Sequence, residues 1–187
     1  MPLKSSFKKA SIRETVEYHE VKDSSKYFQD LLGRWNPSKD FGDNDRIRET
    51  DLRDSFLHFL DSKEESMQHD KEFEVKNRRR ADISLTFRGS DEKVVHLVEF
   101  KYGLDSGKVT TLKGQINNYW NEKVRHVYVV IIKDEVRGKD VNPKYIKELK
   151  EEYSKLGFKF RQKFSIKGIH IYIKQMSKGR GSVEKVI

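Results

Sequence analysis

The chain has 187 residues, of which 35% are hydrophobic and 37% are charged, and its net charge is +9. It contains no cysteine, which excludes disulfides, iron–sulfur clusters and cysteine-ligated zinc. No run approaches the roughly 18 apolar residues that a membrane span needs, and residues 1–10 lack the apolar stretch of a secretory signal. We therefore expect no membrane partner and a cytoplasmic location, or the host cytoplasm for a viral protein.

The excess of Lys and Arg suggests a polyanionic partner, most often a nucleic acid. The same composition is found in heat-tolerant proteins, which are rich in Lys and Glu. Composition alone does not separate these two interpretations, and both can hold for one protein.

The length is that of one domain. Residues 1–22 are charged without clear periodicity and are expected to form an arm. Residues 24–35 carry an apolar stripe at helical spacing, which is either a dimer contact or part of the protein's own core. A loop over 37–45 precedes a second helix, predicted over about 45–62.

A first strand is predicted to begin at about 74–76. Two further strands, 80–87 and 94–101, flank a polar turn that contains Gly89. A helix over about 110–122 follows them.

The next strand, 124–132, is apolar enough to be central in a sheet. Pro143 is suited to the first turn of a helix that is predicted to stop at Gly157. Segments 158–166 and 169–173 alternate like a closing hairpin, and a loose basic tail is expected after them.

This order of elements predicts an α/β fold in which a central mixed β-sheet is flanked by helices. We divide the chain into an N-terminal arm with an amphipathic helix (1–44), a core (45–175) and a flexible basic tail (176–187).

The turn between the second and third strands defines the most informative pattern. Any even-length loop centred between Ser90 and Asp91 places Asp82 directly opposite Glu99. Opposed residues of an antiparallel pair share a face, with Cβ atoms about 5 Å apart. Lys101 is two residues past Glu99 and shares that face. Two carboxylates and an ammonium therefore form a patch that can hold a hard divalent cation beside a lysine.

Glu49 is the third acid of interest. It lies on the apolar face of its predicted helix, three residues before Leu52 and seven before Phe56. A carboxylate on a buried face is costly unless it is paired or coordinated. Its place in the first turn, where acids favour the helix dipole, is the simpler explanation. Beside Asp82 and Glu99 we favour a functional role.

Gln115 and Tyr119 are four residues apart and share one helix face, which also suits an ordinary amphipathic helix. Because the hairpin leads directly into this helix, we expect both near the acidic patch. The run Arg78, Arg79 and Arg80 is either a solvated cluster or a set of phosphate contacts at the mouth of the site. We favour phosphate contacts.

Together these residues resemble the PD-(D/E)XK nuclease superfamily over roughly residues 45–132. The matching positions are Asp82, Glu99-Phe100-Lys101, the upstream helix with Glu49, and Gln115 to Tyr119, which is similar to the Q-x-x-x-Y element of the RecB-like branch. The chain departs from the pattern at Ala81, where the motif has Pro.

The resemblance implies a nuclease that hydrolyses phosphodiester bonds in DNA with Mg²⁺ or Mn²⁺ as cofactor. Carboxylates are the hard oxygen ligands that these ions prefer. Asp82 and Glu99 would be direct ligands, the Phe100 carbonyl a third, and Glu49 a direct or water-mediated one.

Lys101 would polarise the attacking water or stabilise the charge that develops on the phosphate. On the resemblance, Gln115 would orient Lys101 or the water, and Tyr119 would contact a backbone phosphate.

Two alternatives stay open. One is a catalytically silent nucleic-acid-binding or assembly module on the same fold. The other is a Holliday-junction resolvase-like enzyme that acts on branched DNA as a homodimer. The presence of Glu49, Asp82, Glu99 and Lys101 together argues against silence, because a decayed site usually loses one of its residues.

Overall fold

The structure is a computed structural model, and a part of the chain is described in it. The described residues are 24–42, 46–63, 67–75, 79–87, 95–119, 124–164, 168–176 and 182–187. The arm expected over 1–22 and the residue Arg78 lie outside them.

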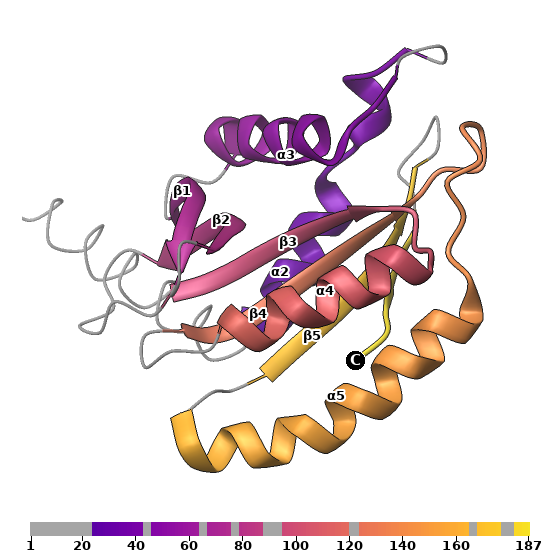
Figure 1. Ribbon diagram of the computed structural model, residues 1–187. Helices are drawn as coiled ribbons and strands as arrows, with labels where there is room; N and C mark the ends of the chain where they lie inside the picture. Colours follow the sequence, from indigo (N-terminus) through magenta and orange to yellow (C-terminus); the bar gives the residue numbers. More distant parts are fainter. Residues whose placement is uncertain are drawn as a thin grey trace, which may run out of the picture.

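A six-stranded mixed sheet in the order β1-β2-β3-β4-β5-β6 forms the middle layer (Figure 1). Its strands are β1 Met67–Val75, β2 Arg79–Phe87, β3 Val95–Tyr102, β4 Val124–Lys133, β5 Gly168–Gln175 and β6 Val183–Lys185. The pairs β1–β2, β2–β3 and β5–β6 are antiparallel, and the pairs β3–β4 and β4–β5 are parallel. The predicted mixed sheet is confirmed.

Helices cover both faces of this sheet, as predicted. They are α2 Ser24–Arg34, α3 Glu49–Lys63, α4 Ser106–Tyr119 and α5 Pro143–Phe164, with a short 3-10 turn at Pro37–Lys39. One hydrophobic core joins α2 and α3 to the sheet, and the other joins α4 and α5 to its opposite face. Figure 1 shows α4 and α5 on the near side of β3–β5 and α2 on the far side. Within the described residues, no helix has the length and apolar character to cross a membrane.

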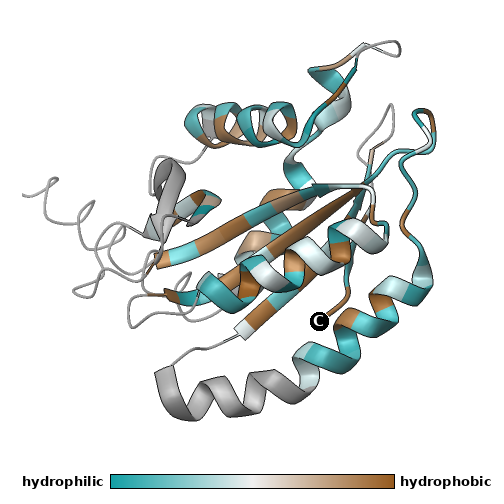
Figure 2. Cartoon of the chain, viewed as in Figure 1, coloured by the Kyte–Doolittle hydropathy of each residue, from teal (hydrophilic) through white to brown (hydrophobic). Residues whose placement is uncertain are grey.

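The central strands are the most deeply buried elements. Every residue of β3 is buried, and β4 is buried except at Arg125 and Lys133. Figure 2 shows apolar residues along these strands, whereas the helices carry hydrophilic residues between their apolar ones. A strand that is covered on both faces reads as a continuous apolar run, which is why 124–132 could be predicted as central.

The apolar stripe of α2 packs on the protein's own core. Phe28, Leu31, Leu32 and Trp35 are at most 2% exposed. The Phe28 ring stacks on Tyr128 of β4 with centroids 4.1 Å apart. The stripe therefore packs inside the protein and does not form a dimer contact. A homodimer stays a prediction that no longer rests on this stripe. Because α2 and α3 share one core, the boundary drawn at residue 44 does not separate two packing units.

The predicted end of the long helix at Gly157 is wrong. Helix α5 continues through that residue to Phe164, so the predicted strand over 158–166 and the closing hairpin are wrong as well. An isolated Gly costs a helix only about 1 kcal/mol. Strands β4 and β5 are parallel, and their ends can be joined only by a long crossover.

The residues expected to form a flexible tail contain a strand. β6 pairs with β5 through Tyr172↔Lys185, Ile173↔Glu184 and Lys174↔Val183. Three residues are too few to give a periodic signal in the sequence, which is why the charged composition was misleading. Residues 177–181 lie outside the described part.

The turn after β3 requires a glycine. Gly103 has φ +70°, and its N–H donates to the Ile132 carbonyl at 2.8 Å. A Cβ at this position would lie 3.2 Å from the Asp140 carbonyl oxygen. This turn leads from β3 into α4, so it sets the relative position of two elements of the site described below.

We expect Gly103→Ala to lower the free energy of unfolding by about 1–3 kcal/mol, because Ala is strained at positive φ. Urea denaturation measures the effect. Gly107→Ala is the matched control, since that glycine is helical and exposed and a Cβ there would meet only the Asp105 side chain, at 3.4 Å. The control should be neutral or slightly stabilising. Equal stabilities of the two variants would contradict a special role for the turn.

Candidate active site

Asp82 and Glu99 lie next to each other at the point where the pairing of β2 with β3 ends. The register Ile83↔Val98 through Thr86↔Val95 confirms the predicted alignment, which places Asp82 opposite Glu99. The pairing of β2 with β3 stops at Ile83, although β2 stays paired with β1 down to Arg79. Next to this last pair, the Phe100 N–H donates to Asp82 Oδ2 at 2.8 Å. The side chain of Asp82 is thereby fixed against β3.

Glu99 is held by donors from two elements. It is 2% exposed. Lys101 Nζ lies 2.7 Å from its Oε1, and Gln115 Nε2 donates to the same oxygen at 2.5 Å. The Tyr119 hydroxyl donates to Oε2 at 2.5 Å. The structure thus brings Gln115 and Tyr119 of α4 to the acidic patch.

The contacts of Gln115 and Tyr119 differ from those expected. Gln115 bonds to Glu99 rather than to Lys101, and its Oε1 is buried without a hydrogen-bond partner among the described residues. Tyr119 is 0% exposed, so the expected phosphate contact is not supported. Burial first and the Glu99 carboxylate second raise the pKa of Tyr119 above its ordinary value. Tyr119 therefore stays protonated and fixes Glu99.

Glu49 reaches the patch from the first turn of α3. Its Oε1 accepts the Tyr102 N–H at 3.1 Å, and its Oε2 lies 3.5 Å from Lys101 Nζ. Since Lys101 also binds Glu99 at 2.7 Å, the bridged oxygens of Glu49 and Glu99 are at most about 6 Å apart, within water-mediated reach of a shared cation. Glu49 is thus both a first-turn acid and a neighbour of the site.

Lys101 is a buried cation between two acids. It is 4% exposed. Burial lowers the pKa of Lys101, but the carboxylates of Glu99 and Glu49 raise it, and the net direction is upward. Lys101 is therefore an ammonium at neutral pH and acts as a hydrogen-bond donor and positive charge rather than as a base.

Asp82 ionises less readily than an ordinary aspartate. Burial, and then the negative charge of Glu99, raise its pKa to about 7. The Phe100 N–H and the charges of Lys101 and Arg53 act in the opposite direction without cancelling this. Two close carboxylates in a buried place favour a shared proton or a bound cation.

Two basic residues of the site were missed in the sequence. Lys108 Nζ lies 3.3 Å from Glu49 Oε1 and donates to the Tyr102 carbonyl. Arg53 is 5% exposed and close enough to lower the pKa of Asp82. Helical spacing in the sequence could have identified both residues as neighbours of the site. Lys108 is seven residues before Gln115 on α4, and Arg53 is four residues after Glu49 on α3.

The arginine run is described only in part. Arg80 is exposed, and its carbonyl oxygen lies 3.3 Å from the Tyr119 hydroxyl, whose proton is donated to Glu99 at the shorter distance. Arg78 and the side chain of Arg79 lie outside the described part. Phosphate contacts by these arginines stay a prediction.

The donor chemistry of the patch suits a hard divalent cation. Within the described residues, no three His, Cys, Asp or Glu side chains are arranged as a metal-binding group. Mg²⁺, however, usually binds through one or two carboxylates and keeps several waters. Asp82 and Glu99 supply such oxygens, and the pKa of Asp82 is raised by burial and then by repulsion from Glu99, a repulsion that a cation would relieve. The carbonyl of Phe100 and the carboxylate of Glu49 stay predicted ligands.

Comparison with known proteins adds little. No protein-family model matches the chain, and no curated protein matches it. Among solved structures, it is similar to SfsA of Pyrococcus furiosus in complex with Ca²⁺, with 14% identity and a TM-score of 0.39. The match covers 73% of this chain and 62% of SfsA. The likeness to the PD-(D/E)XK superfamily therefore stays a resemblance in sequence motifs. The candidate active site is supported by the geometry described above.

Proposed function

We propose that the protein is a metal-dependent nuclease that hydrolyses phosphodiester bonds in DNA. The observation that carries this proposal is the convergence of Asp82, Glu99 and Lys101 at the divergence of two strands. Two hard carboxylates beside a fixed ammonium match the needs of phosphate hydrolysis, which are charge neutralisation and an oriented water.

Each residue of the patch has a distinct role in the proposal. Mg²⁺ or Mn²⁺, held by Asp82 and Glu99, would neutralise phosphate charge and lower the pKa of a bound water. The Lys101 ammonium donates to the water or to a phosphate oxygen. Gln115 and Tyr119 hold Glu99 in place through the bonds described above. Glu49 orients Lys101 from the other side.

The direct test is incubation with linear, circular and four-way-junction DNA, and with RNA, in Mg²⁺, Mn²⁺ or EDTA. We expect cleavage of DNA with either metal and none in EDTA. Preferential cutting of the junction would favour the resolvase-like alternative. Binding without cleavage under every condition would contradict the proposal and leave the silent module.

Glu49→Gln is expected to reduce cleavage by about 10²-fold or more, because it keeps the shape of the side chain but removes the charge that faces Lys101. Single-turnover cleavage measures this. Asp61→Asn is the matched control, since it removes the same charge from an exposed position of α3. Asp51 is unsuitable, because it accepts the Arg48 N–H at the start of the helix. Wild-type turnover by Glu49→Gln would remove Glu49 from the site.

A further inference from the structure

A basic cavity lies directly beside Glu49, on the side that Lys108 occupies. Its volume is about 430 Å³. It is lined by Arg46, Ile47, Arg48, Glu49, Tyr102, Lys108, Arg137 and Lys139. Five of these side chains are cationic and one is acidic. None of the five was singled out in the sequence, because they come from separate segments of the chain.

Two of the five cations are neutralised and build the walls. Arg48 binds Asp51 at 2.9 Å, and Arg137 binds Asp134 at 2.7 Å. Arg137 also donates to the Gly42 carbonyl, which ties the turn after β4 to the segment before α3. These contacts fix the shape of the cavity but leave little of their charge for a ligand.

The other three cations supply its positive charge. Within the described residues, neither Arg46 nor Lys139 forms an ion pair, and both are exposed. Lys139 Nζ lies 5.7 Å from the centre of the Tyr102 ring, a cation–π contact that leaves the ammonium able to bind an anion. Lys108 divides its contacts between Glu49 and the Tyr102 carbonyl. The cavity therefore keeps an excess of positive charge next to the acidic patch.

The position of Glu49 connects this cavity to the catalytic patch. Its Oε2 lies 3.5 Å from Lys101 Nζ, and its Oε1 lies 3.3 Å from Lys108 Nζ. One carboxylate thus separates the lysine of the patch from the lysine of the cavity. Adjacent phosphates of one strand are a single nucleotide apart, which is longer than the helical rise of about 3.4 Å per strand. A strand with one phosphate near Lys101 would therefore have its next phosphate on the far side of Glu49, at the cavity.

We propose that the cavity is a subsite for a phosphate group of the substrate strand, next to the phosphate that is cleaved. Arg46 and Lys139 make the direct contacts, and the arginine can bind two phosphate oxygens at once. That the phosphate belongs to a nucleic acid rests on the proposed function; the capacity of the cavity for a phosphate anion does not.

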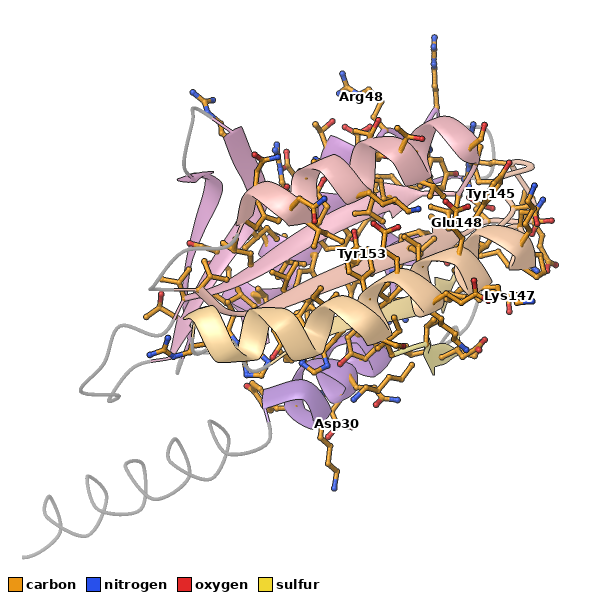
Figure 3. The ribbon with its side chains drawn as sticks, turned by 60° about the horizontal axis from the view of Figure 1, so that its bottom comes forward. Asp30, Arg48, Tyr145, Lys147, Glu148 and Tyr153 are labelled. Carbon is orange, nitrogen blue, oxygen red and sulfur yellow. The ribbon has the colours of Figure 1, made fainter. Side chains whose placement is uncertain are left out.

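The test uses the full chain and the double variant Arg46→Ala/Lys139→Ala. Calorimetry with inorganic phosphate, and fluorescence anisotropy with single-stranded DNA in EDTA at several salt concentrations, measure binding without cleavage. The control is Lys144→Ala/Lys147→Ala, which removes the same charge from exposed positions of α5. Figure 3 shows Lys147 well separated from Arg48, which lines the cavity.

We expect the cavity variant to lose at least tenfold in affinity for phosphate and for DNA. Its plot of log affinity against log salt concentration should have a shallower slope, by an amount that corresponds to the loss of up to about two phosphate contacts. The control should change either affinity by less than twofold. Both variants should unfold at the wild-type temperature, since the substituted side chains are exposed. Affinities of the cavity variant equal to those of the control would overturn the proposal.

A neutral methylphosphonate placed beside the cleaved bond tests the position of the subsite. It should slow cleavage by the wild type and have little further effect on the cavity variant. Equal slowing of both would overturn the placement. If the protein cleaves DNA and neither binding nor cleavage depends on Arg46 and Lys139, the subsite is refuted and the proposed nuclease activity is retained. Phosphate binding that does depend on them, without any cleavage, would retain the anion site and refute the nuclease.

Discussion

Lys101→Ala is expected to reduce DNA cleavage by about 10²–10³-fold or more, the range found when one preorganised donor is removed from a catalytic site. Its ammonium is fixed 2.7 Å from Glu99 and 3.5 Å from Glu49. Because its pKa lies above the ordinary value, Lys101 is charged at neutral pH. Alanine removes both the charge and the donor. Single-turnover kinetics with Mg²⁺ measures the loss.

DNA binding by this variant should persist in EDTA, since Lys101 is buried and contributes little to the exposed positive surface. Metal binding should persist or tighten, because a positive charge next to the carboxylates is gone. Lys101→Arg should not restore cleavage, since a planar guanidinium differs from a compact ammonium. Lys113→Ala is the control on α4, where Lys113 pairs with Glu148 and Glu152 away from the patch. Wild-type turnover by Lys101→Ala would exclude the residue from the mechanism.

The acidic hairpin could be predicted because its geometry is local. A short turn fixes the register of two strands, and the period of two then assigns every side chain to a face. The opposition of Asp82 and Glu99 needs nothing further from the rest of the fold. Glu49 was predictable for a similar reason, since helical spacing placed it on the face that packs against the sheet.

The partners of the α4 residues could not be predicted from the same rule. Spacing shows that Gln115 and Tyr119 share a face, but it does not show whether that face meets solvent or the sheet. Packing of α4 on the sheet buries Tyr119 completely and directs both side chains to Glu99. This burial leaves the phosphate contact predicted for Tyr119 without support.

The C-terminal errors have a different cause. Gly157 is a local stop signal, but the parallel pairing of β4 and β5 is a non-local requirement, and the crossover helix continued through the glycine. The basic cavity is also non-local. Its wall depends on a bond between Arg137 and Gly42, which are 95 residues apart. The sequence shows the cations but does not show which of them are neutralised.

Asp82→Asn is expected to stabilise the metal-free protein at neutral and alkaline pH. The amide oxygen can still accept the Phe100 N–H that Asp82 Oδ2 accepts now. The substitution removes a charge that is both buried and repelled by Glu99, the two effects that raise the pKa of Asp82 to about 7. One pKa unit corresponds to about 1.4 kcal/mol, so the gain should be on the order of 1–3 kcal/mol after relaxation of the site.

The sign of the pH dependence follows from the direction of this shift. Asp82 is protonated in both states below its unfolded pKa of 3.8, so it then has no effect on stability. Between that value and about 7 only the unfolded chain ionises, and stability falls as pH rises. Above about 7 the penalty is complete. Urea unfolding in EDTA from about pH 4.5 to about pH 8.5 should show this fall in the wild type and in Asp61→Asn, and a flatter curve in Asp82→Asn.

With a divalent metal present, the wild type should be more stable than Asp82→Asn, the reverse of the order in EDTA. A ligand that binds only the folded state stabilises it by mass action, so Mn²⁺ should raise the unfolding temperature of the wild type more than that of Asp82→Asn. Calorimetry should show weaker Mn²⁺ binding by the variant, because one negative oxygen ligand is lost, and cleavage should fall with it. An Asp82→Asn protein that is less stable than the wild type at about pH 8.5 in EDTA would identify Asp82 as an ordinary stabilising acid. Unchanged Mn²⁺ affinity would exclude it as a ligand, and the acidic pair could then no longer be assigned to a metal site.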